Sequence, residues 1–235
     1  MKRIVLAAVI VLAGLAATAG PAGATNECKG LQVCVRVPGP WVVVPAVRGT
    51  PRVPVQYQLA CPRGFTVGGL DAELSIRAID IDFSGLLGSP VNPGVTTSQA
   101  ALFRAVYTGT AVATPAFRPH LGCIPVAGGG GGPVPFRAPD VFPPGQPTVR
   151  RVHNVRLHLG VTRAVAACVS GERLISGWHA LAFGTAKAPD AGLVSSVSAA
   201  RSIRGNRVVV RVRANSAVGG TPAVVQVGAV CGGGS

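Results

Sequence analysis

The stretch CPRGFTVGGLDA, residues 61–72, is repeated in a weaker form as CVSGERLISGWHA, residues 168–180. Cys61 aligns with Cys168, and Gly64 with Gly171, at an offset of 107 residues that becomes 108 after one inserted residue. The trio Thr-Pro-Ala recurs at the same offset, at residues 114–116 and 221–223. The spacing therefore predicts an internal duplication in which each copy forms one domain.

Each copy carries two cysteines, which stand 62 residues apart in the first copy and 63 apart in the second. Six cysteines allow about 15 pairings, and the repeat selects one of them. A bridge that closes about 60 residues contributes roughly 4 kcal/mol in the loop-entropy model. The C-x2-C spacing typical of metal sites is missing from the sequence, so disulfides are favoured. The predicted pairs are Cys61–Cys123, Cys168–Cys231 and a local pair, Cys28–Cys34.

Residues 207–213, RVVVRVR, alternate in the way of a half-buried β-strand. A period of two places Val208, Val210 and Val212 on one face, and Arg207, Arg211 and Arg213 with Val209 on the other. Residues 155–159 alternate in the same way, and residues 97–106 are the one stretch after residue 24 that favours a short helix. The sequence predicts an all-β fold of two tandem, disulfide-stapled, β-sandwich-like domains.

The chain begins with Lys2 and Arg3, an apolar run to about residue 17, and the small residues Ala22, Gly23 and Ala24. This order is typical of a secretory signal peptide, so we expect residues 1–24 to be removed and the protein to be secreted. No later apolar run reaches the ~20 residues of a membrane helix, and no transmembrane segment is expected after signal removal. Five consecutive glycines and several prolines favour a linker over residues 126–148, between β domains at 25–125 and 149–235.

Several phrases of the chain resemble a group of secreted actinobacterial proteins. They are CPRGFTVGGLDAELS (61–75), GSPVNPGVTTSQA (88–100), FRPHLGC (117–123) and VQVGAVC (225–231), together with the glycine run. The resemblance covers most of the chain after residue 24 and implies a secreted protein with a duplicated, cysteine-containing β domain. The group has no known activity, so the resemblance implies no functional residues.

Four of the eight acidic residues lie within twelve positions: Asp71, Glu73, Asp80 and Asp82. Asp80 and Asp82 alternate with apolar residues, so both carboxylates are expected on one face of a strand, about 6–7 Å apart. Three interpretations stay open. The carboxylates could pair with arginines such as Arg77 and Arg104; they could bind calcium, which prefers several oxygen ligands; or, with His120, they could serve a secreted hydrolase.

Catalytic motifs give no further support to an enzyme. The sequence contains neither a G-x-S-x-G nucleophile elbow nor the H-E-x-x-H pair of zinc proteases. His153 and His158 are five residues apart on an expected strand, which places them on opposite faces. His179 follows Trp178 near an expected disulfide and is interpreted as a packed residue. No cofactor is expected apart from possible calcium, and a non-enzyme is favoured.

The chain after residue 24 is strongly basic, with 20 basic and eight acidic residues and a net charge of +12. The residues expected to attract polyanions are Arg150, Arg151, Arg156, Arg207, Arg211 and Arg213. Specific nucleic-acid recognition is not expected, because aromatic platforms that stack single-stranded bases are missing and no DNA-binding motif appears. We therefore expect a secreted, non-catalytic binding or structural module of the cell envelope, whose partner is an anionic wall polymer or an envelope protein. The alternative is a hydrolase or calcium-dependent module that uses Asp71, Glu73, Asp80 and Asp82.

Overall fold

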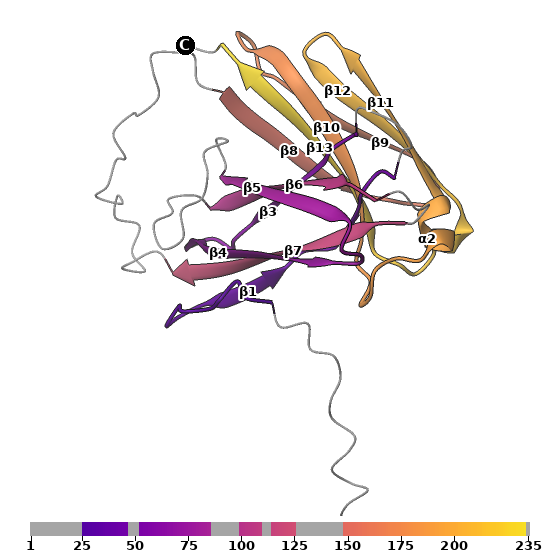
Figure 1. Cartoon of the computed structure of the whole chain (residues 1–235). Helices are drawn as coiled ribbons and strands as arrows, with labels where there is room; N and C mark the ends of the chain where they lie inside the picture. The colour runs from indigo at the N-terminus through magenta and orange to yellow at the C-terminus, as the bar shows by residue number, and fades with distance from the viewer. Residues whose placement is uncertain (1–24, 47–51, 86–98, 110–113, 126–147, 234–235) are drawn as a thin grey trace, which may run out of the picture.

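The computed structural model describes residues 25–46, 52–85, 99–109, 114–125 and 148–233, which Figure 1 shows as packed β-sheets. Within these ranges the helical elements are a short α-helix, α2 (Ala191–Ser195), and a 3₁₀ turn, η1 (Ser216–Val218). The predicted all-β class is confirmed. The predicted signal peptide, residues 1–24, and residues 126–147 of the predicted linker lie outside the described residues.

The first half of the chain supplies seven strands. They are β1 (Val35–Pro38), β2 (Trp41–Val43), β3 (Val55–Ala60), β4 (Phe65–Leu74), β5 (Ile79–Gly85), β6 (Ala100–Tyr107) and β7 (Ala116–Pro125). β3, β6 and β5 form a three-stranded antiparallel sheet with β6 in the centre. β7 pairs with β4 along one edge and with β1 and β2 along the other.

The second half supplies six strands. They are β8 (Thr148–Arg156), β9 (Gly160–Ala167), β10 (Arg173–Phe183), β11 (Val197–Arg204), β12 (Arg207–Ala214) and β13 (Ala223–Gly232). β9, β12 and β11 form a three-stranded sheet with β12 in the centre, and β13 lies between β10 and β8.

The strands pair in the same order in both halves. β7 lies between β4 and β1 as β13 lies between β10 and β8, and β6 is the centre of one small sheet as β12 is of the other. A β-bulge interrupts β4 at Gly68 and β10 at Ile175, positions that again stand 107 residues apart. This agreement fits the sequence offset, and a common origin by duplication stays a prediction.

β2 joins the two halves into one sheet. Val42 pairs with Phe117 of β7 on one side and with Ala182 of β10 on the other, while Trp41 pairs with Phe183. The result is a seven-stranded antiparallel sheet that begins with β4 and β7 and continues through β2, β10, β13 and β8. The two units that the sequence predicts therefore share their largest sheet.

The two small sheets cover opposite faces of this large sheet. Val42, Phe117 and Ala182 are register partners on one face, where they pack with Phe103 of β6. The opposite face carries residues such as Val225, which pack in a second core with Val208, Val210 and Val212 of β12. The predicted inward orientation of these three valines is confirmed, and all three are fully buried.

A fully buried polar side chain, Gln226 of β13, links the halves. Its Oε1 accepts a hydrogen bond from the main-chain N–H of Gln58 at 2.6 Å. Its Nε2 donates to the main-chain oxygen of Gln58 and to Oδ1 of Asn154, each at 2.9 Å. The amide thus pairs with the edge of β3 as the main chain of a neighbouring strand would.

The disulfides are the three predicted pairs, Cys28–Cys34, Cys61–Cys123 and Cys168–Cys231. Gly64 and Gly171 turn the chain soon after the first cysteine of each copy, with φ of +81° and +87°, a conformation that favours glycine. The predicted short helix over residues 97–106 is wrong, because residues 100–107 form β6. Pairing with β3 and β5 along both edges, and burial of Phe103, outweigh the local helix preference of this stretch.

Candidate functional site

The outer face of the β9–β12–β11 sheet is a basic surface. The inward residues of β12 pack in the core, and the alternate residues point outward. Five arginines that share this outer face by register are exposed, and we call them the arginine face: Arg163 of β9, Arg204 of β11, and Arg207, Arg211 and Arg213 of β12. The predicted outward orientation of the three β12 arginines is confirmed.

Two pairs of these arginines face each other across the sheet, Arg211 opposite Arg163 and Arg207 opposite Arg204. The Cα atoms of directly opposed residues lie about 4.5–5.5 Å apart, and like charges placed in this way destabilise a sheet. Within the part of the chain that the structure describes, none of the five forms an ion pair with a carboxylate. The arginine face is thus an array of uncompensated positive charge.

The other three arginines of the predicted patch lie elsewhere. Arg150, Arg151 and Arg156 belong to β8, at the edge of the large sheet. By register Arg150 and Arg156 share a face with Gln226, which points toward β3 and therefore away from the small sheet of β12. The structure brings together only Arg207, Arg211 and Arg213 of the predicted set, and adds Arg163 and Arg204.

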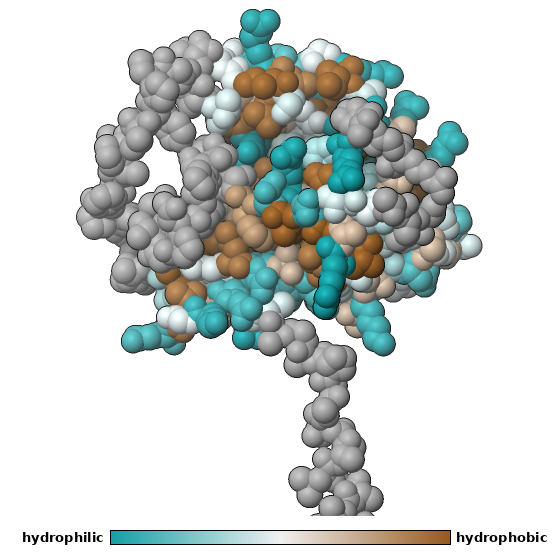
Figure 2. Space-filling model, in the orientation of Figure 1, coloured by the Kyte–Doolittle hydropathy of each residue, from teal (hydrophilic) through white to brown (hydrophobic). Residues whose placement is uncertain are grey.

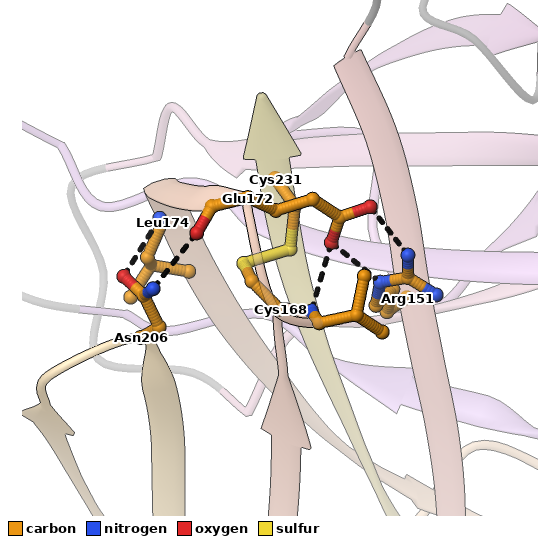
Figure 3. Close-up of a disulfide and its surroundings, with 7 residues drawn as sticks. Arg151, Cys168, Glu172, Leu174, Asn206 and Cys231 are labelled. Carbon is orange, nitrogen blue, oxygen red and sulfur yellow. Dashed lines mark hydrogen bonds and ion pairs between the residues drawn. A yellow bond between two sulfur atoms is a disulfide. The ribbon is translucent and has the colours of Figure 1, made fainter. Parts of the chain in front are cut away.

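Arg151 is held by Glu172 beside the Cys168–Cys231 disulfide (Figure 3). The Glu172 carboxylate accepts hydrogen bonds from Arg151 Nε at 3.0 Å and Nη2 at 2.5 Å, and from the Val169 N–H at 2.9 Å. The Arg151 hydrogen bonds, followed by that from Val169, lower the pKa of Glu172, and the same pair raises the pKa of Arg151. The Asn206 amide donates to the Glu172 main-chain oxygen at 2.8 Å. These contacts attach the β9–β10 turn to β8 and to the turn between β11 and β12.

The three residues at this disulfide, Cys168, Glu172 and Cys231, are the one group of three potential metal-ligand side chains that lie within 4.8 Å of one another in the described ranges. Both sulfurs are bonded to each other, and a metal ligand would have to be a thiolate. The carboxylate is already engaged by Arg151. These residues therefore do not fit a metal ion.

The four carboxylates proposed for calcium are not brought together. Asp80 and Asp82 lie exposed on β5 in the small sheet, whereas Asp71 and Glu73 lie on β4 in the large sheet. Asp82 Oδ2 lies 3.7 Å from Nη1 of Arg104, as the ion-pair interpretation predicts. Residues 86–98, which follow β5, lie outside the described residues.

Asp71 and Glu73 instead face His120 of β7, together with a buried carboxylate, Glu27, that sequence reasoning missed. Asp71 is the register partner of His120 and accepts a hydrogen bond from the Asn26 N–H at 2.5 Å. His120 Nδ1 lies 3.8 Å from Glu27 Oε1, and its Nε2 lies 3.9 Å from Glu73 Oε2. Burial is the main effect on the pKa of His120 and lowers it, although Glu27 opposes this shift.

This arrangement fixes the N-terminal segment to the large sheet. The Glu27 side chain is 1% exposed, and its main-chain oxygen sits where a Cβ on Gly69 or Gly122 would lie, 1.8 and 2.1 Å away respectively. Only glycine at those two positions lets the chain approach so closely. Glu27 and His120 are therefore held together against the large sheet, where Glu27 Oε2 and His120 Nε2 are buried without a hydrogen-bond partner among the described residues.

Charge is divided unequally between the halves. Residues 149–235 contain 11 basic and two acidic residues, whereas residues 25–125 contain eight basic and five acidic ones.

The space-filling view also shows apolar surface at the upper end of the second half (Figure 2). Large exposed apolar side chains near the strand ends beside the Cys168–Cys231 disulfide include Val149, Ile175 and Ile203.

Comparison of the chain with models of protein families, with curated proteins and with solved structures found no match in any of the three. Among the described residues, no helix has the length and apolar character required to span a bilayer. Two of these site residues were not predicted from the sequence. Arg163 could have been, because it lies between the buried positions Thr162 and Ala164 of an alternating strand. Glu27 could not, because its partners are distant in sequence.

Proposed function

We propose that this protein is a secreted, non-catalytic module that binds an anionic polymer of the cell envelope through the arginine face. The observation that carries the proposal is the pairing of Arg211 with Arg163, and of Arg207 with Arg204, on an exposed sheet surface. The three disulfides are compatible with an oxidising, extracellular location.

Opposed arginines repel each other in the free protein, and an anionic polymer lying along β12 would relieve that repulsion. Arg211 and Arg213 stand two residues apart on one strand, which separates their Cα atoms by about 6.6 Å. Arg207 lies four residues before Arg211, so the positive charge extends along the strand for about 20 Å. A linear polymer with regularly spaced charges matches this surface better than a single compact anion does.

The carboxylates support binding over hydrolysis. Asp80 and Asp82 are exposed on one sheet, Asp71 and Glu73 lie on another, and the two pairs share no site in the described structure. In a glycoside hydrolase the acid and base carboxyl groups must flank one scissile bond. The hydrolase and calcium alternatives therefore have less support than the arginine face.

The test is a pull-down of residues 25–235 on isolated cell walls and, separately, on vesicles of anionic lipid, across a salt series. Arg207, Arg211 and Arg213 are replaced together by Gln. We expect wall retention of the parent protein that weakens as salt rises from low to moderate concentration, because salt screens exposed charges. The triple variant should be released at a lower salt concentration.

A matched control replaces three exposed arginines of the first half, Arg52, Arg63 and Arg77, by Gln and so removes the same charge. Equal losses in the two triple variants would show that net charge, and not the arginine face, causes retention. Absence of wall binding at every salt concentration would overturn the proposal. Binding to vesicles but not walls would assign the surface to lipid, with the exposed apolar residues Ile175 and Ile203 as the next to replace.

A further inference from the structure

A pocket of about 330 Å³ lies at the seam between the two halves. Its floor is the edge of β10 at His179–Leu181, and its walls come from the end of β2, the start of β3 and β11. Apolar groups such as Val43, Val53 and Leu181 line much of it, and Arg201 of β11 contributes a guanidinium. Its volume lies at the lower end of the range for ligand pockets.

The edge of β10 that forms the floor carries main-chain groups that point into the pocket. Gly184 N donates to Pro222 O across the β10–β13 pair, so the even-numbered residues of β10 direct their main-chain groups toward β13. The alternate residues, including His179 and Leu181, therefore direct their N–H and C=O groups to the opposite edge. On that edge, the pairing of β10 with β2 ends at Ala182.

A proline prevents the ladder from extending as far as His179. The register of β2 with β10, Val42 with Ala182, would place Pro45 opposite His179 if the ladder continued. Proline has no N–H and cannot supply the hydrogen bond that the C=O of His179 would accept. In the described part of the chain no residue pairs with His179 on this edge, so its main-chain groups are open to a ligand.

Arg201 closes the far end of the gap. Its guanidinium donates to the main-chain oxygen of Gly177, the next residue of β10 whose main-chain groups point to this edge. A guanidinium has five N–H groups in all, so others are left for a ligand. None of the described lining residues is acidic. Burial, and to a lesser extent Arg201, lowers the pKa of His179, which favours the neutral imidazole. The pocket therefore has a single positive charge at one end.

We propose that this pocket binds the carboxyl-terminal end of an extended peptide. The terminal carboxylate pairs with Arg201, an amide of the peptide exchanges hydrogen bonds with the main chain of His179, and an apolar side chain packs against Val43, Val53 and Leu181. The peptide takes the place in the sheet that Pro45 leaves empty. An N-acylated amino acid has the same chemistry in a shorter form.

This site is separate from the arginine face. Arg201 is the register partner of Val210, whose side chain points into the core, whereas the arginine face lies on the other side of the same small sheet. Failure of one proposal therefore leaves the other standing. Arg201 and Arg204, three residues apart on β11, provide a matched pair of substitutions.

The test titrates residues 25–235 with the tripeptide acetyl-Gly-Ala-Val, with its carboxyl-terminal amide and with acetyl-valine. Binding is followed by calorimetry and by the main-chain amide NMR signals of His179 and Leu181. We expect saturable binding of the free acid, with at least about 10-fold weaker binding of the amide, because a charge-assisted hydrogen bond is lost. If acetyl-valine binds as well as the tripeptide, the occupant is an acylated amino acid.

Arg201→Gln keeps a hydrogen-bond donor for the Gly177 oxygen and removes the positive charge. It should weaken binding of the tripeptide about 10-fold or more. Arg204→Gln should leave peptide affinity unchanged while lowering retention on walls. Equal affinity for acid and amide, equal effects of the two substitutions, or no shift of the His179 and Leu181 signals would each overturn the proposal.

Discussion

Replacement of Gln226 by Leu should uncouple the two halves of the molecule. The Gln226 amide is fully buried and makes three hydrogen bonds, two of them to the main chain of Gln58 on β3. Leucine has a similar size, so the substitution leaves little empty space. It does leave the N–H and C=O of Gln58 without partners, and these main-chain groups cannot be removed by any change of sequence.

The expected cost follows from those two orphaned groups. Each buried polar group that loses its partner costs about 1–3 kcal/mol, which gives about 2–6 kcal/mol for Gln58. Asn154 also loses its bond from Gln226, but its side chain is at the exposed edge strand β8 and water can replace the lost partner. A total of this size is a large part of the 5–15 kcal/mol that typically stabilises a folded protein.

Urea unfolding with the disulfides intact would measure the effect, followed by both tryptophan fluorescence and far-UV circular dichroism. The parent should unfold in one transition, whereas the variant should unfold at lower urea, with the two signals no longer coincident if the halves separate. Gln56→Leu is the matched control, two residues from Gln58 on the same strand. If Gln226→Leu costs no more than Gln56→Leu, the amide contributes no net stability and the reasoning fails.

Three other predictions concern single contacts. Gly69→Ala should displace the N-terminal segment, because the new Cβ would lie 1.8 Å from the Glu27 oxygen, and limited proteolysis should then cut near residue 27 while the sheets persist. Glu172→Gln should lower the melting temperature at pH 7, and by progressively less as the pH falls below 4.5. Because the pKa of Glu172 is lower in the folded protein, the ionised carboxylate stabilises the fold above pH 4.5, and this stabilisation is lost as the pH falls. A difference in melting temperature that does not change with pH would contradict the Arg151 pairing. Replacing both cysteines of Cys168–Cys231 by Ser should cost roughly 4 kcal/mol in urea unfolding, whereas a cost under about 1 kcal/mol would contradict the loop-entropy estimate.

Local periodicity was sufficient to predict the strand at residues 207–213, because one face of β12 packs in the core and the other carries exposed arginines, although Val209 on that second face is also buried. The repeat likewise predicted the disulfides, since equal cysteine spacing in two copies selects one pairing among many. The helix predicted over residues 97–106 was wrong because Ala and Leu favour helices locally. Only pairing with β3 and β5 makes this stretch a strand.

Features that depend on long-range pairing could not be predicted. The link between the halves rests on three residues of β2, too short a run to indicate its partners. The division of the predicted arginine patch follows from the placement of β8 and β12 in different sheets. Similarly, Asp71 meets His120 through a register between strands about 50 positions apart, and no local pattern reports such a contact.

Because β2 joins the two halves in one sheet, we expect them to stay associated without a covalent link once the chain has folded. A single cut between Pro125 and Thr148 would leave two fragments, each still stapled by its own long disulfide. The pairing of β2 with β10, and the Gln226 amide on β3, would hold these fragments together without a peptide bond. The two halves thus contact each other as two different subunits of a dimer would, and they could be produced as separate chains and reassembled.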